Sequence, residues 1–481
     1  MGEHGSALEP ESSSRAHDQA DARQVPLVVD LDGTLVRSDL PIETLFLFAR
    51  LRPFGLLALP FWLAKGRAHL KQRLAQTAPP DVQTLPYCDS VIARLEAERD
   101  RGVPIILATG ADQRLARAVA THLGLFDAVF ASDGTVNLTG VRKRDRLVAA
   151  FGLQGFDYLG AERDDQPVRE AARKTITPVP PGAKQGDAVG PTAKAYLQAL
   201  RPYQWLKNSL VLIPLFGSHQ LYEPEPLIQC LLAFVAFSLC ASSAYLVNDL
   251  MDLPSDRHHP RKKQRPFASG RISPAYGAAL IPILLAAGLG VAALLPALFL
   301  GVLVFYCALT LSYSVRLKDV VILDVLTLAG LYALRVMGGS AAVGIPPSAW
   351  LLAFCVFLFF SLAMVKRYAE LVAMRTIEGK QAHARGYILA DAELLAALGG
   401  ASGYLSVLVL ALYIAGDAAP TPAVRYNLIW LICLLLLYWI SYVWLMAHRG
   451  RMHDDPLVFA LRDPVSRALV VAMAVILFLA T

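Results

Sequence analysis

Residues 226–256 read PLIQCLLAFVAFSLCASSAYLVNDLMDLPSD, a stretch that joins a long apolar run to a cluster of acids. The run, residues 226–247, carries no charged side chain and has about the 20-residue length that a membrane-spanning helix needs. Three carboxylates follow it, Asp249, Asp252 and Asp256. On one continuous helix, at about 100° per residue, they would share an arc of roughly 60°. We therefore expect a membrane helix that carries three acids on one face of its end.

Carboxylates packed on one face repel each other, and a divalent cation is the simplest way to keep them ionised. Mg²⁺ prefers oxygen ligands and commonly bridges one or two carboxylates to substrate phosphates. The spacing therefore predicts a Mg²⁺–diphosphate site. The alternative is an acidic loop at the membrane edge, paired with Arg257 and Arg261. Pro254 lies inside the motif and removes a helical N–H, so the placement of Asp256 depends on how the turn responds.

Composition indicates a membrane protein joined to a soluble domain. The 481 residues are 55% hydrophobic and 17% charged, against roughly 25% charged in ordinary globular chains. These values exclude a purely soluble enzyme, a secreted disulfide scaffold and a disordered chain. Nine segments after residue 203 are candidate membrane helices: 204–220, 226–247, 276–294, 297–314, 320–339, 349–366, 394–415, 426–446 and 464–481.

Charge distribution predicts the orientation of these segments. With nine crossings and an inside N-terminus, the inner loops carry fifteen Lys and Arg residues, and the outer loops carry only Arg425. This asymmetry is typical of cytoplasmic loops, so the net charge of +6 does not indicate nucleic-acid binding. The first 24 residues lack the apolar region of a signal peptide. We expect a multi-pass protein of the bacterial inner membrane with a cytoplasmic N-terminal domain.

The N-terminal part alternates short apolar runs with helical patterns. Residues 25–32 (VPLVVDLD), 103–108 (VPIILA) and 127–130 resemble buried strands, which predicts a parallel α/β sheet. Residues 41–75 are helical and unusually apolar, and we expect them to cap the core rather than rest on the membrane surface. The predicted organisation is a disordered tail (1–24), an α/β domain (25–175), a linker (176–194) and an all-α membrane domain (195–481).

The acidic stretch NDxxDxxxD at residues 248–256 resembles the signature of the UbiA superfamily of intramembrane prenyltransferases. The flanks RPYQWLKN (201–208) and KKQRPFASG (262–270) resemble the family's helix entry and basic loop. The resemblance implies nine transmembrane helices and Mg²⁺ bound by Asp249, Asp252 and Asp256.

Members that act on aromatic acceptors carry a second acidic motif, and here KRYAEL (366–371) stands in the corresponding loop. Together with YSVRLK (313–318) and Leu323-Asp324, it resembles the decaprenyl-phosphate phosphoribosyltransferase branch. That implies Mg²⁺-dependent transfer of 5-phosphoribose from phosphoribosyl diphosphate to a polyprenyl phosphate in the bilayer. The substrate-binding residues that we expect in this domain are Lys207, Asn208, Asn248, Arg265, Tyr313, Lys318, Asp324, Arg335, Lys366, Arg367 and Glu370.

Two other functions stay open: prenyl transfer from a prenyl diphosphate to an aromatic or other acceptor, and a non-catalytic lipid-binding or transport protein. A homo-oligomer also stays open. We expect residues 453–455 to form a solvated loop without a role in the site.

The sequence DLDGTL, residues 30–35, follows a predicted strand and resembles motif one of the haloacid dehalogenase (HAD) superfamily, whose domain is Rossmann-like. The resemblance implies that Asp30 is a phosphoryl-accepting nucleophile and Asp32 a general acid/base. Thr109 and Lys143 match the residues that bind the phosphate.

The metal ligands that this second resemblance implies are Asp30, Asp32 and Asp165. Family members usually have an acid where this chain has Ala161, so the first metal ligand of motif four is missing unless Glu162 replaces it. Either the domain is an active phosphatase, with the 5-phosphate of the lipid-linked product as its substrate, or it is retained for binding or structure.

Overall fold

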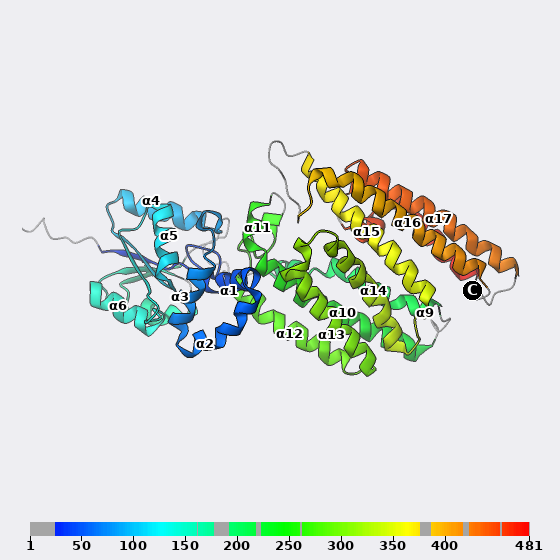
Figure 1. Ribbon diagram of the computed structural model, residues 1–481. Helices are drawn as coiled ribbons and strands as arrows, with labels where there is room; N and C mark the ends of the chain where they lie inside the picture. Colours follow the sequence, from blue (N-terminus) through cyan, green and yellow to red (C-terminus); the bar gives the residue numbers. More distant parts are fainter. Residues whose placement is uncertain are drawn as a thin grey trace, which may run out of the picture. The chain divides into compact units, whose positions relative to one another are not determined.

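The computed structural model describes residues 25–160, 162–177, 192–217, 223–259, 262–375, 386–416, 423–452 and 455–480 (Figure 1). The predicted tail and most of the predicted linker lie outside these ranges. The chain divides into two compact units. Unit 1 comprises Met1–Pro191 with Leu253–Pro274, and unit 2 comprises Thr192–Asp252 with Ala275–Thr481.

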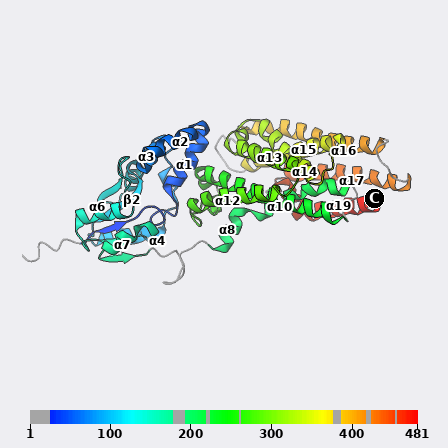
Figure 2. The ribbon, with the colours of Figure 1, turned by 90° about the horizontal axis from the view of Figure 1, so that it is seen from below.

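A five-stranded parallel sheet forms the centre of unit 1, in the order β3-β2-β1-β4-β5 (Figures 1 and 2). The strands are β1 (Leu27–Val29), β2 (Ile105–Asp112), β3 (Ala128–Ser132), β4 (Asp157–Leu159) and β5 (Lys174–Ile176). Val28 is in register with Ile106 on one side and with Tyr158 on the other. All carboxyl ends therefore meet at one edge of the sheet, and the predicted parallel α/β fold is confirmed.

Alternate side chains of β1 reach opposite faces of the sheet, as the two-residue period of a strand requires. Leu27 and Val29 belong to one apolar cluster, and Val28 belongs to another. The first cluster includes residues of α4 (Asp89–Asp100) and α5 (Gln113–Leu123). The second includes residues of α6 (Val141–Phe151) and α7 (Gln166–Ala171). Helices thus bury both faces, which explains why β1 reads as a continuous apolar run.

The predicted helical region 41–75 forms a small cap within unit 1. Its elements are α1 (Leu40–Leu51), the 3₁₀ helix η1 (Pro53–Ala58), α2 (Leu59–Ala64) and α3 (Arg67–Thr77). Phe48 and Leu74 are buried where α1 and α3 pack together. Phe54 and Phe61 are 88% and 73% exposed, so no described residue of unit 1 covers the apolar face of η1 and α2 on which they lie. The buried centre of the cap comes from α1 and α3, and α2 adds Leu59 and Trp62, which pack against it while Phe61 stays exposed.

Unit 2 is helical. Its helices are α8 (Ala193–Leu200), η4 (Pro202–Leu212), α9 (Ile213–Gly217), α10 (Pro224–Met251), α12 (Pro274–Ala292, whose first residue belongs to unit 1), α13 (Ala297–Val315), η6 (Leu317–Asp319), α14 (Leu323–Val343), α15 (Ala349–Arg375), η7 (Leu389–Asp391), α16 (Ala392–Ala415), α17 (Ala423–His448), α18 (Pro456–Arg462) and α19 (Pro464–Ala480). Within the described ranges, seven helices are long and apolar enough to cross a membrane.

Two of the nine predicted crossings form shorter helices. Residues 204–220 fall in the 3₁₀ helix η4 and the five-residue α9, and residues 218–220 lie outside the described part. Residues 464–480 form α19, which has 17 residues, and residue 481 lies outside the described part. Pro214 explains the first case, because it would fall in the interior of one continuous helix over these residues and has no N–H to donate. The prediction of nine spanning helices is therefore not confirmed.

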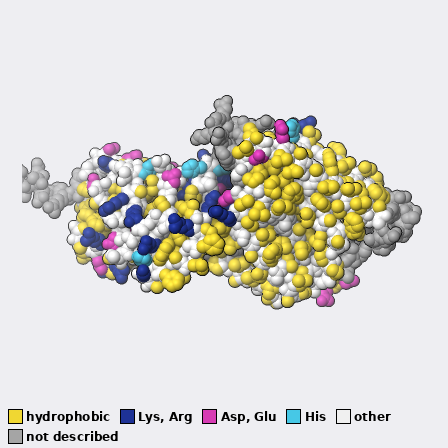
Figure 3. All heavy atoms as spheres, viewed as in Figure 1, with side chains coloured by type: hydrophobic (Ala, Val, Ile, Leu, Met, Phe, Trp, Pro, Cys, Tyr) yellow, Lys and Arg dark blue, Asp and Glu magenta, His cyan; other side chains and the backbone are white. Residues whose placement is uncertain are grey.

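Apolar surface and small residues organise the packing of unit 2. Hydrophobic side chains cover most of its face in Figure 3, and Leu294 and Leu434 are 74% and 63% exposed. Inside, a Cβ built on Gly339 of α14 would lie 2.0 Å from the carbonyl oxygen of Val211. Glycine thus lets η4 press against α14, the most buried of the seven helices.

Candidate functional site

The acidic motif lies at a helix break. Helix α10 ends at Met251, Asp252 is its C-cap residue, and α11 (Leu253–His258) begins immediately afterwards. Pro254 accounts for the break because it cannot continue the hydrogen bonds of α10. The assumption of one continuous helix was therefore wrong. Asp249 and Asp252 belong to unit 2, whereas Asp256 belongs to unit 1 and accepts a hydrogen bond from Arg265 at 2.6 Å.

Asp249 and Asp252, the two acids of the motif in unit 2, each pair with a basic side chain. Arg201 donates to Asp249 Oδ1, and Lys318 donates to both oxygens of Asp252 at 2.9 Å. Lys318 also donates to Asn248 Oδ1 at 3.2 Å. The four charged side chains are at most 13% exposed, and Asn248 is half-buried. The carboxylate oxygens form the hard donor set that Mg²⁺ prefers, so the residues fit that ion.

Arg201 was not among the predicted site residues, although it begins the quoted flank RPYQWLKN. Its φ is +52°, a left-handed conformation that is uncommon for a side chain of this size. In this conformation its guanidinium reaches Asp249 and lies over the ring of Tyr245, with its central carbon 5.4 Å from the ring centre. Arg201 therefore sets the charge around Asp249 in the same way that Lys318 does around Asp252.

A second charged group joins three helices around Asp455. Lys207 of η4 donates to Asp455 Oδ2 at 2.7 Å, and Lys366 of α15 lies 3.4 Å from the same oxygen. Tyr332 of α14 donates to Asp455 Oδ1 at 3.2 Å. The Asp455 side chain is only 7% exposed, so the prediction of a solvated loop was wrong at this residue. His453 and Asp454 lie outside the described residues.

Asp455 N-caps α18 by accepting from the backbone N–H of Leu457. In the sequence it is one acid in a polar stretch, and nothing there shows that two predicted phosphate-binding lysines converge on it. Lys207 and Lys366, both predicted to bind substrate, therefore lie close together. Asp455 lies between them, and the sequence did not indicate this acid.

Arg335 lies inside the apolar helix α14, where an unpaired charge would be costly. Its Nε donates to Asn208 Oδ1 at 2.8 Å, and its Nη2 donates to the Tyr306 hydroxyl at 2.9 Å. The guanidinium also lies over the rings of Tyr306 and Tyr332. The predicted residues Arg335 and Asn208 thus form one buried hydrogen-bonded group.

Arg367 is held mainly by acids of its own domain. It donates to Asp324, to Glu370 and, at 2.9 Å, to the Tyr313 hydroxyl, and its side chain is fully buried. Asp324 also accepts from the Tyr387 hydroxyl at 2.6 Å. These predicted substrate residues are together, but Arg367 has protein partners on all three nitrogens. Of the predicted KRYAEL cations, Lys366 is the one placed to meet a further anion.

Unit 1 brings the HAD-like residues together at the carboxyl edge of the sheet. Lys143 of α6 donates to Asp30 Oδ1 and to Asp165 Oδ2, both at 2.7 Å, and to the Tyr158 hydroxyl at 3.0 Å. Thr109 of β2 is fully buried, and its hydroxyl accepts from the N–H of Ala111. The predicted cluster of nucleophile, lysine and motif-four acid therefore exists.

Glu162 supplies the carboxylate that Ala161 cannot. Carboxylate oxygens of Asp30, Glu162 and Asp165 all lie within 4.8 Å of one another, a spacing that suits one cation. Asp30 Oδ2 is buried and has no hydrogen-bond partner among the described residues. Asp32 is not in this group, and its Oδ1 accepts from the backbone N–H of Leu40 at 2.8 Å. The residues fit a metal ion through a ligand set that includes Glu162.

Burial and mutual repulsion set the protonation of these acids. Burial raises the pKa of Asp30 to about 6, and the charge of Asp165 adds to this effect while Lys143 opposes it. Burial and the neighbouring charges of Asp30 and Asp165 raise the pKa of Glu162 to about 8. Burial lowers the pKa of Lys143, but the two aspartates outweigh it, so the net shift is upward. A divalent cation would relieve the repulsion and keep the acids ionised.

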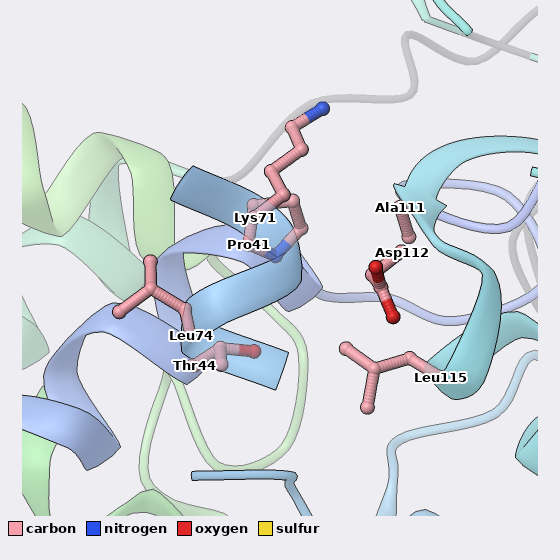
Figure 4. Close-up of a pocket in the computed structure, with 7 residues that line it drawn as sticks. All are labelled: Pro41, Thr44, Lys71, Leu74, Ala111, Asp112 and Leu115. Carbon is pink, nitrogen blue, oxygen red and sulfur yellow. The ribbon is translucent and has the colours of Figure 1, made fainter. Parts of the chain in front are cut away.

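The cap contributes Lys71, which the sequence did not indicate. Its Nζ donates to the Gly110 carbonyl at 2.7 Å and to Asn137 Oδ1 at 2.9 Å. Burial lowers its pKa, although the charges of Asp32, Asp39 and Glu162 oppose the shift. Figure 4 shows Lys71 on α3 at the wall of a small pocket that separates the cap from Asp112 and Leu115. Lys71 therefore joins the cap to the phosphatase-like edge of the sheet.

These features define an integral membrane protein with a buried site of acids and cations in unit 2 and a HAD-like domain in unit 1. The profile of the UbiA prenyltransferase family matches residues 211–462, and that of the haloacid dehalogenase-like hydrolases matches residues 27–155. The chain belongs to the UbiA prenyltransferase family and carries an N-terminal HAD-like domain.

Relatives match either nearly the whole chain or only part of it. An uncharacterized protein, y4nM, of Sinorhizobium fredii is 38% identical over an alignment of 468 residues that covers 92% of this chain and 89% of that protein. The decaprenyl-phosphate phosphoribosyltransferase of Mycobacterium tuberculosis is 40% identical over an alignment of 192 residues that covers 37% of this chain and 61% of that protein. A solved UbiA homologue from Archaeoglobus fulgidus, bound to DMAPP and Mg²⁺, is 17% identical with a TM-score of 0.45, covering 59% of this chain and 99% of its own.

Proposed function

We propose that the membrane domain transfers 5-phosphoribose from phosphoribosyl diphosphate to a polyprenyl phosphate at the cytoplasmic face of the inner membrane. The observation that carries the proposal is the pair Lys207 and Lys366, which converge on one buried carboxylate. A site for two anionic substrates needs cations beyond those that hold the acidic motif. The relative named a phosphoribosyltransferase supports the same reaction.

In the proposed reaction, the bond from ribose C1 to the diphosphate oxygen breaks, and a bond from C1 to a lipid phosphate oxygen forms. The diphosphate leaves with the electron pair of the broken bond. Because the lipid phosphate is already an anion, the attack needs no strong general base. Mg²⁺, when bound, neutralises charge on the departing diphosphate.

The side chains of this chain have three tasks in that scheme. Asp249 and Asp252 would hold the metal, and Asn248 helps to orient Lys318 beside them. Lys207 and Lys366 reduce the repulsion between the two anionic substrates, since each can donate to phosphate oxygens. Arg335, Asn208 and the Arg367 group hold the surrounding helices in place.

Label transfer tests this proposal. In membranes that contain the full chain, ribose label from phosphoribosyl diphosphate should enter the lipid fraction in a Mg²⁺-dependent reaction. Asp249→Asn should lower transfer at least about 100-fold, because charge stabilisation of this kind contributes roughly that factor or more. A matched control is Asp391→Asn, whose side chain caps the 3₁₀ helix η7. Label from a prenyl diphosphate entering an aromatic acceptor would instead support the prenyl-transfer alternative, and unchanged lipid binding without any transfer would support the non-catalytic one.

We also propose that the HAD-like domain is an active phosphatase, and the observation that favours this is the position of Glu162 beside Asp30 and Asp165. Its proposed substrate is the 5-phosphate of the lipid-linked product, and its removal would pull the transfer forward. The full chain should release inorganic phosphate from that lipid, and Asp30→Asn should abolish the release. Phosphate release that persists in Asp30→Asn would refute this assignment.

A further inference from the structure

Leu253–Pro274, which contains the last acid of the motif, Asp256, and the basic loop after it, belongs to unit 1. Leu253, Phe267, Ala268 and Ile272 are each at most 5% exposed. Asp256 and the basic loop after it therefore belong structurally to the same unit as the HAD-like sheet. This placement raises the question of which part of the HAD-like domain they contact.

A buried ion pair forms the first contact. Arg257 of α11 donates through Nη1 to Glu43 Oε2 at 2.9 Å and through Nη2 to Glu43 Oε1. The two side chains are 5% and 3% exposed, and the Ser38 hydroxyl also donates to Glu43. A bidentate pair between a guanidinium and a carboxylate fixes direction as well as distance. Breaking such a pair leaves a buried charge without compensation.

A close backbone approach forms the second contact. Gly270 has a φ of +70°, and a Cβ there would lie 2.6 Å from the Cβ of Arg37 and 2.7 Å from its carbonyl oxygen. The same Cβ would lie 3.2 Å from Cβ of Pro86, to whose carbonyl Arg37 donates its N–H. Only glycine fits this position, so the segment is built to lie against residues 37 and 86.

Both contacts meet the turn that carries the HAD-like acids. The first N–H of α1, that of Leu40, donates to Asp32 Oδ1, and the N–H of Gly33 donates to the Ser38 carbonyl. Glu43 lies in the first turn of α1. On the opposite side of the ion pair, Arg257 directly follows Asp256, the third acid of the membrane motif. The contact of Arg257 with Glu43 thus joins α11, which carries Asp256 of the membrane motif, to α1, which follows the turn with the HAD-like acids.

We propose that the turn Asp30–Glu43 is a docking surface for residues 253–274, and that Glu43 and Arg257 are positioning residues that couple Asp256 to the state of the HAD-like site. A phosphoryl group on Asp30 changes the charge beside Asp32, and the hydrogen bond from Leu40 passes that change to the start of α1. The ion pair then transmits the movement to α11. The proposal rests on the proposed function only where it expects a change at Asp256, the third acid of the motif, to alter ribose transfer.

Hydrogen–deuterium exchange of the full chain in nanodiscs tests the docking without any activity. Glu43→Gln should raise exchange in peptides from residues 253–274 at least tenfold, and the charge swap Glu43→Arg with Arg257→Glu should restore at least part of the protection. Glu96→Gln, an exposed acid on α4, is the matched control and should change nothing. Unchanged exchange in Glu43→Gln would overturn the docking.

Beryllium fluoride with Mg²⁺, a mimic of phosphorylated aspartate, tests the coupling. In the wild type it should alter exchange in residues 253–274 at least threefold, and in Glu43→Gln this response should disappear while the turn after β1 still responds. A response confined to that turn in the wild type would overturn the coupling, as would no response in either segment.

Transfer of labelled ribose provides a separate readout. Glu43→Gln should raise the KM for phosphoribosyl diphosphate about tenfold, with a smaller change in kcat, and Glu43→Asp should recover most of the loss. A wild type that transfers no label would refute the proposed function, whereas the exchange results would still decide the docking.

Discussion

Replacing Lys143 with methionine should show how much the stability of unit 1 depends on one buried ammonium group. The Lys143 side chain is 1% exposed, and those of Asp30 and Asp165 are 2% and 3% exposed. Removing one partner from such a buried pair typically costs about 3–5 kcal/mol. Screening by solvent is minimal at this burial, so the full range applies. Since about 1.4 kcal/mol is a factor of ten, local opening should become roughly 140- to 3,700-fold more frequent.

In metal-free buffer, the loss of stability caused by Lys143→Met should depend on pH. The pKa of Asp30 is raised from 3.8 to about 6, mainly by burial. A raised carboxyl pKa adds stability that is complete below about pH 4 and is lost as the pH rises through 6. Lys143 lowers this pKa, so in the variant the loss should continue above pH 6. The difference between variant and wild type should therefore be larger at pH 8 than at pH 5.

Hydrogen–deuterium exchange in EDTA, measured on peptides from β1 and β4 of the full chain and corrected for intrinsic rates, measures both effects. The matched control is Arg144→Met on the same helix, because Arg144 is 39% exposed and pairs with the adjacent Asp145. It should cost less than about 0.5 kcal/mol, as exposed substitutions usually do. If Lys143→Met and Arg144→Met differ by less than threefold in exchange, or if their difference is equal at the two pH values, the reasoning fails.

Three further predictions concern single contacts. Glu162→Ala should lower Mg²⁺-dependent phosphate release by the full chain at least about 100-fold, while Glu162→Asp should keep part of it; equal rates in wild type and Glu162→Ala would remove this residue from the metal site. Asp455→Asn should reduce kcat/KM for label transfer about 10- to 100-fold, because it leaves two lysines without their shared counter-ion, and an unchanged value would show that Asp455 does not position them. A spin label at Phe61→Cys in nanodiscs should be more accessible to oxygen than to a water-soluble nickel complex if the exposed face of η1 and α2 rests on the bilayer, with a label at Glu96→Cys as the aqueous control; the reverse order at Phe61 would exclude membrane contact.

Much of unit 1 could be predicted because local patterns carry its fold. The strand of β1 reads as a continuous apolar run because helices bury both its faces, and Asp30 follows it directly. The resemblance to the HAD family implied that Asp30 and Thr109 lie in one site, and the structure places them directly after β1 and within the neighbouring strand β2. Lys143 and Asp165 were placed by resemblance, and the structure brings both to Asp30. The role of Glu162 depended on the path of the chain after β4, which spacing alone does not define.

The membrane domain was less predictable in detail. Apolar length predicted the seven long helices. It also predicted a crossing at residues 204–220, because apolar length does not show that Pro214 and the 3₁₀ geometry of Pro202–Leu212 interrupt a continuous helix. The arc of three acids assumed a helix that Pro254 ends. Asp455 is 248 residues from Lys207 along the chain, so no spacing could have linked them.

The sequence by itself determined the two-domain organisation, the parallel sheet, the membrane-embedded helices and the residue types of both sites. These follow from hydrophobic periodicity and from short motifs, which act over a few residues. Only the tertiary structure decided which charges meet: Arg201 with Asp249, Lys318 with Asp252, Lys207 and Lys366 with Asp455, and Arg257 with Glu43. Such pairings depend on long-range packing of helices, because a buried charge finds its partner in space and not along the chain.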